Sequence, residues 1–168
     1  MIFVGRSIWR YVGRYGMTIA VAVLLQALYL KHPDPLTGTL APTNQSPWEL
    51  SKALFWPYLC GILLFGENDD GARRNAQYLM LLILPLLCVT VFSVFSGANH
   101  WMVWCIVLAA GMTMELLMVS KRIWGGELLW VTLAILLGIA YLLFTVLPPM
   151  GGIFLDPRDV TTFAPIPF

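Results

Sequence analysis

Polar side chains that could bind a ligand gather in one short stretch of the chain. It reads Asn44-Gln45-Ser46-Pro47-Trp48-Glu49-Leu50-Ser51-Lys52. A carboxylate can act as a general acid or base, and an amine three residues later can hold a phosphate group. Beside an amide, a hydroxyl and an indole, these two groups could recognise a polar head group. The candidate binding residues in this stretch are therefore Asn44, Ser46, Trp48, Glu49 and Lys52.

The same stretch also has the pattern of a helix start. Ser46 suits the N-cap, Pro47 the first helical position and Glu49 the third, which is the order of a capping box. Lys52 follows Glu49 by three residues, so the two side chains can pair on one helix face. A structural role therefore competes with ligand binding for the same residues, and it is the simpler explanation.

Glu115 is the second candidate, because it is an acidic residue inside a long apolar run. It precedes Lys121 by six residues, or roughly 9 Å along a helix. Ionisable groups at membrane depth are costly and usually face a partner or the bundle interior. We expect one of two roles: coupling of a proton or cation to transport, or pairing near the interface with Lys121, Arg122 or Arg73.

Other patterns typical of catalysis or metal binding do not occur in the sequence. It has no nucleophile elbow, no phosphate-cradling glycine loop and no His-Glu metal motif. The three cysteines, Cys60, Cys88 and Cys105, fall in apolar runs and are expected to be free thiols. Gln26 is a lone amide in the first apolar run and is expected to hydrogen-bond to a neighbouring helix. We predict neither a metal nor a cofactor, and an enzyme is the less favoured class.

The composition excludes a water-soluble domain. Hydrophobic residues make up 59% of the 168 residues and charged residues only 11%, with a mean hydropathy of +0.78. Soluble domains contain roughly 25% charged residues, and much of their surface must face water. A bilayer removes that requirement, because positions that face lipid are apolar. The net charge of +1 gives no indication of a nucleic-acid partner.

Five apolar runs could form transmembrane helices, each of which needs about 20 mostly apolar residues. We predict an all-α, polytopic helix bundle with spans at about residues 10–30, 47–66, 75–96, 101–119 and 126–147. Together they form one integral membrane domain over residues 1–168, with an outer-face tail at 148–168. The run at 47–66 is the weakest of the five, because it begins with polar residues and contains Pro57.

Basic residues are distributed unevenly between the two sides of such a bundle. The side of the N-terminus holds Arg6, Arg10, Arg14, Arg73, Arg74, Lys121 and Arg122, and the other side holds Lys31, Lys52 and Arg158. Because basic residues accumulate in cytoplasmic loops, we predict a cytoplasmic N-terminus and an outer C-terminus. With four spans the tail would instead be cytoplasmic. Tryptophans near the ends of the runs, Trp48 and Trp104 among them, are expected to form an interfacial belt.

The stretch at 42–57 resembles the signature of an uncharacterised family of small bacterial multi-pass membrane proteins. Those proteins read Pro-x-Asn-Glu-Ser-x-Trp-Glu-His-x-Lys-x-x-Phe-x-Pro, and this chain reads Pro-Thr-Asn-Gln-Ser-Pro-Trp-Glu-Leu-Ser-Lys-Ala-Leu-Phe-Trp-Pro. The end is also similar, since two prolines at 148–149 precede Ile-Phe-Leu-Asp-Pro at 153–157. The resemblance implies a multi-span fold and singles out Asn44, Ser46, Trp48, Glu49, Lys52, Asp156 and Pro157.

Both motifs lie on the outer face of the predicted topology, which suggests that the tail folds back over the start of the second span. The chain also departs from the family pattern at three positions. The family's second Glu is Gln45 here, the His after Trp-Glu is Leu50, and a His near the end of the first span is Gln26. Catalysis or metal binding that depends on those groups would be lost from this chain.

These observations favour a binding or accessory protein in a bacterial plasma (inner) membrane. At an outer site made by residues 44–52 and Asp156, it would recognise a membrane lipid head group, a partner subunit or a second copy of itself. One alternative is a small transporter or channel that uses Glu115. The other is a lipid-modifying enzyme with Glu49 as acid or base and Lys52 holding a phosphate.

Overall fold

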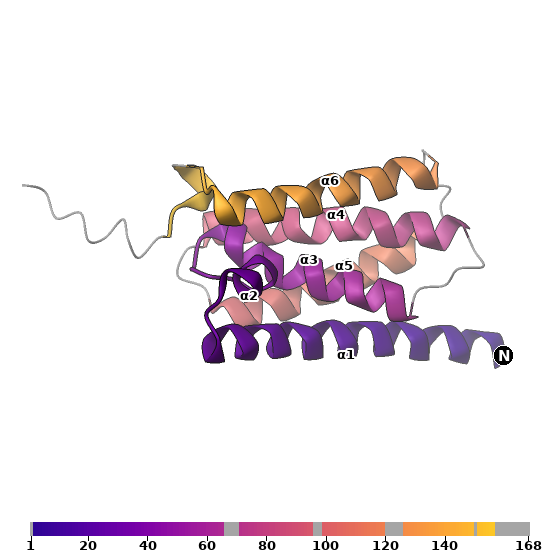
Figure 1. Cartoon of the computed structure of the whole chain (residues 1–168). Helices are drawn as coiled ribbons and strands as arrows, with labels where there is room; N and C mark the ends of the chain where they lie inside the picture. Colours follow the sequence, from indigo (N-terminus) through magenta and orange to yellow (C-terminus); the bar gives the residue numbers. More distant parts are fainter. Residues whose placement is uncertain (1, 66–70, 96–98, 120–125, 150, 157–168) are drawn as a thin grey trace, which may run out of the picture.

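The computed structural model describes residues 2–65, 71–95, 99–119, 126–149 and 151–156, and this part of the chain contains helices but no strand. The elements in chain order are α1 (Ile2–Lys31), α2 (Pro35–Leu40), α3 (Pro47–Phe65), α4 (Gly71–Val94), α5 (His100–Val119), α6 (Glu127–Val146) and the 3-10 helix η1 (Gly152–Phe154). The five long helices lie side by side in a bundle (Figure 1). The prediction of an all-α bundle is confirmed for the described residues.

Successive long helices run in alternating directions between the two ends of the bundle (Figure 1). One end, here called the α2 end, holds α2, the last turn of α1, the start of α3, the end of α6 and η1. The opposite end holds the N-terminus, the end of α3 and the start of α6. The polar stretch at 44–52 and the tail segment before residue 157 therefore meet at the α2 end.

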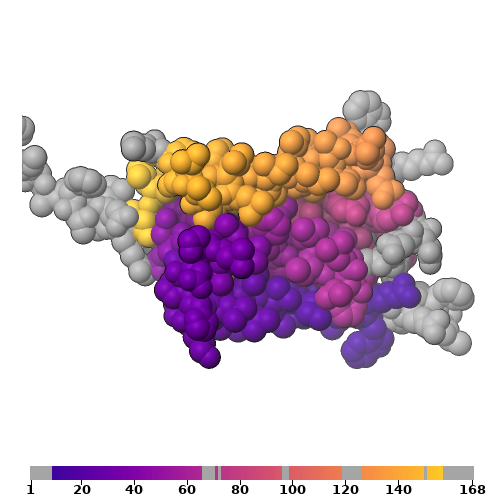
Figure 2. Space-filling model, in the orientation of Figure 1, coloured from indigo at the N-terminus to yellow at the C-terminus, as the bar shows by residue number. Residues whose placement is uncertain are grey.

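Helix α3 lies at the centre of the bundle and contacts every other helix. Thirteen of its nineteen residues are buried, whereas only Ala134, Gly138 and Tyr141 are buried among the twenty residues of α6. Figure 2 shows α6 along one edge of the molecule and α1 along the opposite edge, with α2 and α3 between them. Polar residues on α3 are therefore surrounded mainly by protein.

Four helices are long and apolar enough to cross a membrane, over Trp9–Lys31, Arg73–Val94, His100–Met118 and Glu127–Val146. They expose large apolar side chains such as Leu24, Leu117 and Leu128. Hydrocarbon accommodates such a surface, whereas water does not. Helix α3 is not among these four, and most of its residues are buried inside the bundle.

The predicted spans match the long helices closely, and the differences lie at their ends. Helix α1 already begins at Ile2, and α4 begins at Gly71 rather than at residue 75. The stretch between the first two predicted spans, at about 31–46, is not only a connecting loop, because it contains the short helix α2. Pro35 suits a first helical position, and the Asp34 N–H donates to Thr37 Oγ1 at 3.2 Å, so a helix start is encoded locally.

Gly61 allows α1 and α3 to approach each other closely. A Cβ at this position would lie 2.9 Å from Arg14 Cγ, 3.1 Å from Thr18 Oγ1 and 3.3 Å from the Arg14 carbonyl oxygen. The carbonyl belongs to the backbone of α1, so it can move only if the helix moves. Small residues at helix crossings are a common means of close packing in membranes.

Replacing Gly61 with Leu is expected to push α1 away from α3 and to destabilise the bundle by about 1–3 kcal/mol. The matched control is Gly16→Leu, because Gly16 is exposed on α1 and its Cβ would meet nothing within 4 Å outside its own helix backbone. The free energy of unfolding can be measured for both variants by SDS titration in mixed micelles. Equal stabilities would contradict a close approach at Gly61.

Candidate functional site

A buried ion pair joins α1 to α5 inside the bundle. Arg14 Nη2 donates to Glu115 Oε1 at 2.5 Å, and the exposed fractions of the two side chains are 3% and 0%. The other carboxylate oxygen of Glu115 accepts a hydrogen bond from Tyr58 OH of α3 at 2.7 Å. One carboxylate therefore connects three helices that are far apart in the sequence.

The surroundings of Arg14 hold its guanidinium group in place. Its Cζ lies 5.0 Å from the ring centroid of Tyr11 and 5.7 Å from that of Tyr58, distances typical of cation–π contacts. The Arg14 carbonyl accepts a hydrogen bond from Thr18 Oγ1 at 2.9 Å. Arg14 is one of the basic residues that we expected on the cytoplasmic side, and its pairing with Glu115 is not evident from the sequence, because the two residues lie 101 positions apart.

The contacts of Glu115 favour a structural role for its carboxylate. Both oxygens are engaged by side chains of other helices. The cavity that Arg14 helps to line has a volume of only about 10 Å³, which is room for about one water molecule. Two of the expected partners of Glu115, Lys121 and Arg122, lie outside the described residues.

A second buried ion pair lies at the α2 end, between Glu49 and Lys52 of α3. Lys52 Nζ is 2.6 Å from Glu49 Oε2, which confirms the expected pair on one helix face. The same Nζ donates to the Gly38 carbonyl at 2.8 Å and to Thr145 Oγ1 at 2.9 Å. Glu49 Oε2 accepts hydrogen bonds from the N–H and the hydroxyl of Thr43, at 3.0 and 2.8 Å. The pair thus ties α2, the following loop and α6 to α3.

The start of α3 is capped, although not by the reciprocal arrangement that the sequence suggests. Ser46 Oγ accepts a hydrogen bond from the Glu49 N–H at 3.3 Å, as expected of an N-cap. In a full capping box the Glu49 side chain would bond back to the Ser46 N–H. That N–H donates instead to Asn44 Oδ1 at 2.9 Å. The carboxylate pairs instead with the buried ammonium of Lys52, whose full positive charge attracts it more strongly than a neutral N–H does.

Trp48 lies inside the bundle rather than in an interfacial belt. Its ring packs against three aromatic rings of α6 and η1, with centroids 4.6, 5.4 and 5.2 Å away: Tyr141, Phe144 and Phe154. Trp104 is buried as well, and its Nε1 donates to the Leu50 carbonyl at 3.1 Å. The belt prediction is wrong for these two tryptophans, because they fill the space between helices.

The chain that follows α6 folds back onto the start of α3. Phe154 contacts Trp48, and Asp156 Oδ2 accepts a hydrogen bond from the Gln45 N–H at 2.9 Å. This confirms the fold-back expected from the two sequence motifs. Pro157, which the resemblance singled out beside Asp156, lies outside the described residues.

A polar cavity of about 300 Å³ lies at the α2 end, and we call it the α2-end cavity. Its walls come from α1, the loop before α3, Leu50 of α3, α5 and the tail, and include Gln26, Tyr29, Asn44, His100, Trp104 and Asp156. Of the candidate residues, Asn44 and Asp156 line it, whereas Ser46, Trp48, Glu49 and Lys52 do not. Gln26 Oε1 is buried and accepts no hydrogen bond from the described residues, contrary to our expectation for this amide.

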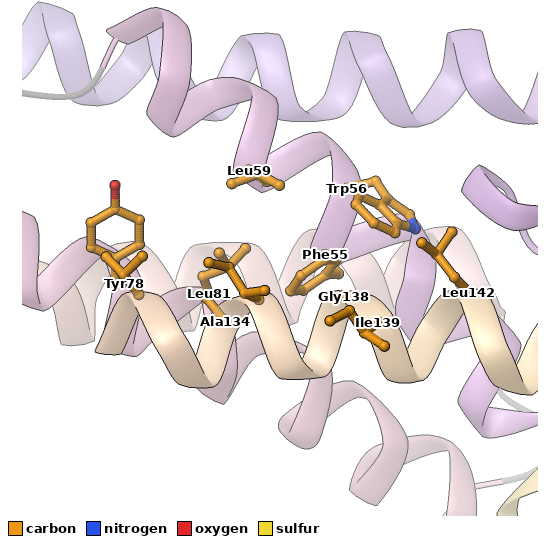
Figure 3. A pocket seen from close by; sticks show the side chains of 11 residues that line it. Phe55, Trp56, Leu59, Tyr78, Leu81, Ala134, Gly138, Ile139 and Leu142 are labelled. Carbon is orange, nitrogen blue, oxygen red and sulfur yellow. The ribbon is translucent and has the colours of Figure 1, made fainter. Parts of the chain in front are cut away.

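A second cavity, of about 340 Å³, lies between α3, α4 and α6 and is almost wholly apolar. In Figure 3, Phe55 and Trp56 of α3 face Gly138 of α6, where a Cβ would lie 3.5 Å from the Phe55 ring. Trp56 Nε1 donates to the Thr39 carbonyl at 3.1 Å, so the indole nitrogen is already used. No Asp, Glu, His, Lys or Arg is among the described residues that line this cavity, so the α2-end cavity is the better candidate for specific recognition.

Comparisons with known proteins add no homologue to this description. No protein-family model, no curated protein and no solved structure matches the chain. The two ion pairs and the α2-end cavity are therefore the features from which a function has to be argued.

Glu115→Gln is expected to destabilise the bundle by about 3–5 kcal/mol, because Arg14 then stays buried without an opposing charge. Combining Arg14→Met with Glu115→Leu removes both charges, and most of the lost stability should return. The free energy of unfolding in SDS titrations reports both effects.

The control for this experiment is Glu127→Gln. Glu127 Oε2 lies 2.8 Å from Arg74 Nη2, with exposed fractions of 39% and 34% for the two side chains. Such a pair contributes at most about 1 kcal/mol. If Glu115→Gln were no less stable than this control, the Arg14–Glu115 pair would not hold the helices together.

Proposed function

We propose that this chain is a multi-pass protein of a bacterial plasma membrane, with five spans, a cytoplasmic N-terminus and an outer C-terminus. The fifth span is α3, which runs from the α2 end to the opposite end of the bundle (Figure 1). Arg14 and Lys52 are buried in ion pairs, so they are left out of the charge count. Six basic residues (7 − 1) then remain on the side of the N-terminus and two (3 − 1) on the other. That excess supports the orientation.

Accessibility of single cysteines tests this topology. In a background without Cys60, Cys88 and Cys105, Leu36→Cys lies before α3 and Gly71→Cys after it, and both positions are exposed. In intact cells a membrane-impermeant maleimide should label Leu36→Cys, and it should label Gly71→Cys only after permeabilisation. Labelling of both positions from one side would show that α3 does not cross the membrane, and the reverse pattern would invert the orientation.

We further propose that the protein is a binding or accessory protein without catalysis of its own, and that it holds a small polar group in the α2-end cavity. The observation that carries this proposal is the cavity itself. Polar side chains from four separate parts of the chain line it, and Gln26 Oε1 there has no hydrogen-bond partner among the described residues. Buried polar atoms are nearly always hydrogen-bonded, so an unpartnered one in a cavity points to a ligand or water. On the proposed topology the cavity opens at the outer face.

The two alternative functions receive less support from the geometry. An enzyme that uses Glu49 and Lys52 needs those groups within reach of a substrate, yet they bond to each other and to Gly38, Thr43 and Thr145. A transporter that uses the carboxylate of Glu115 needs that group to change partners during transport. Both of its oxygens are held by Arg14 and Tyr58.

The resemblance to small bacterial membrane proteins adds weight to the same cavity. The three positions at which this chain departs from their pattern are Gln26, Gln45 and Leu50, and all three line the α2-end cavity. If these membrane proteins bind different ligands in this cavity, their sequences should differ at the residues that line it. Two of the three positions carry amides here, which bind by hydrogen bonding and carry no charge.

Filling the cavity tests the proposal. Gln26→Trp places a large ring where the amide now lines the wall, and Leu28→Trp is the matched control, since Leu28 is exposed on the same helix and does not line the cavity. Native mass spectrometry of the protein in mild detergent should find a retained small molecule or lipid in the wild type and in Leu28→Trp. Gln26→Trp should lose it. Identical ligand content in all three proteins, or a stoichiometric protein partner and no ligand, would contradict the proposal.

A further inference from the structure

We infer that the α2-end cavity binds a neutral group that carries hydroxyls, and that the head group of a membrane lipid supplies it. This inference rests on the proposed function and names the class of its ligand. It follows from the hydrogen-bonding groups in the walls that the described part of the protein does not use.

The acidic residue and the histidine in the walls already have partners. Asp156 Oδ2 accepts a hydrogen bond from the Gln45 N–H at 2.9 Å, and Asp156 has a further interaction as well. The His100 ring packs against Trp101 and Trp104, with centroids 5.6 and 5.2 Å away, and His100 too has another interaction. No other Asp, Glu, His, Lys or Arg is among the described residues that line the cavity. A charged ligand therefore finds no unused opposite charge on these residues.

The groups that remain are three side-chain amides and a phenol. Gln26 Oε1 is buried and accepts no hydrogen bond from the described residues. Asn44 Oδ1 accepts a hydrogen bond from the Ser46 N–H, but the side-chain nitrogen of Asn44 donates to no described residue. The side-chain amide of Gln45 and the hydroxyl of Tyr29 likewise bond to none of them. All four residues line the cavity, so these groups are left for a ligand.

This set contains hydrogen-bond donors and acceptors but no charge. A carboxamide offers two N–H donors and a carbonyl acceptor, and a phenol can donate and accept. An ammonium group would leave the amide N–H groups unpaired, and a phosphate would leave Gln26 Oε1 unpaired, since neither ion has both functions. A hydroxyl donates and accepts through one oxygen, so it matches an amide whichever way the amide is turned. A neutral group with several hydroxyls is therefore the best complement.

Apolar side chains complete the site for such a group. Leu30, Pro42 and Leu50 also line the cavity. Trp104 Nε1 donates to the Leu50 carbonyl, so the indole offers a ligand its ring rather than its N–H. The C–H groups of a polyol can pack against these surfaces while its hydroxyls bond to the amides. Water alone would satisfy the amides but would leave the apolar part of the walls uncovered.

The position of the cavity favours a lipid as the source of the hydroxyls. Its walls include Gln26, Tyr29 and Leu30 from the last turns of α1 and His100 from the start of α5, where two apolar spans end. Spans end at the level of the lipid head groups. Leu30 lines the cavity and is 75% exposed, so the wall continues into the apolar surface of the bundle. A lipid with a glycerol or sugar head group can therefore reach the cavity without leaving the membrane.

The test compares two lipids that differ only in the hydroxyls of the head group. Phosphatidylglycerol ends in a diol, whereas phosphatidylpropanol has the same charge and nearly the same size but no free hydroxyl. The full-length protein is placed in nanodiscs that contain equal amounts of both, and the lipids that it retains on release are counted by native mass spectrometry. We expect phosphatidylglycerol to be enriched about tenfold, which one or two net hydrogen bonds provide.

Three variants locate the source of this preference. Gln26→Met keeps the length of the side chain but removes the amide, so the enrichment should disappear. Gln77→Met is the matched control, because Gln77 of α4 lies outside the cavity and bonds to no described residue, and the enrichment should persist. Tyr29→Phe loses a single oxygen and keeps the ring, so it guards against misfolding of Gln26→Met. It should reduce the enrichment several-fold.

The other outcomes separate the hydroxyl group from its source. Equal retention of the two lipids, together with no binding of free glycerol in saturation-transfer NMR, would overturn hydroxyl recognition. Binding of free glycerol without a lipid preference would support hydroxyl recognition and overturn the lipid as its source. An enrichment that survives in Gln26→Met and Tyr29→Phe would place the diol outside the cavity and would also overturn the inference. The proposed function is decided separately, by comparing the ligands that the wild type and Gln26→Trp retain.

Discussion

Charged groups inside an apolar bundle are stable only when a partner lies in contact with them. The two buried ion pairs of this protein meet that constraint, and each does so across several elements. Arg14 and Glu115 join α1 to α5, with Tyr58 of α3 bonded to the same carboxylate. Lys52 pairs with Glu49 and also bonds to Gly38 before α3 and to Thr145 of α6. The two buried pairs thus connect α1, α3, α5 and α6.

The central position of α3 follows from the same constraint. This helix supplies Glu49, Lys52 and Tyr58, and it contains Ser51, whose Oγ lies 2.6 Å from Tyr141 OH. Placing such polar side chains against lipid costs free energy, because lipid tails offer no hydrogen-bond partners, whereas neighbouring helices do. The helix that carries these residues is therefore the one that other helices surround. The outer helices then supply the apolar surface. Helix α6, with three buried residues in twenty, shows the opposite composition for that reason.

Local sequence patterns predicted much of this arrangement, and the limits of the prediction are also physical. The five long helices, the Ser46 cap and the Glu49–Lys52 pair depend on residues within a few positions of one another. The pair between Arg14 and Glu115 does not depend on neighbouring residues. The two residues are 101 positions apart, and nothing in the sequence pattern connects them. Arg14 was counted as a loop charge because a basic residue before an apolar run is usually one.

The burial of the tryptophans and the location of the cavities are even harder to predict from the sequence. Trp48 and Trp104 lie near the ends of apolar runs, where a belt residue would lie, and only packing shows that both face inward. The α2-end cavity is lined by residues of α1, the loop before α3, α3, α5 and the tail. A linear pattern indicates at most which of these residues are polar. Asn44 and Asp156 were candidates, but Gln26, Tyr29 and His100 join them only through the fold.

One short motif therefore serves two purposes at the α2 end. Glu49, Lys52 and Ser46 find their partners inside the protein and fix the loop. Asn44 and Asp156 each accept a hydrogen bond from the backbone of the loop, and both also line the cavity. A wall held this firmly loses little freedom when a ligand binds, so more of the interaction energy remains as affinity. The ion pair between Glu49 and Lys52 need not touch a ligand to matter for binding. Without this ion pair, fewer hydrogen bonds would hold the loop that positions Asn44 against α3. The cavity would then lose its shape although the residues that line it are unchanged.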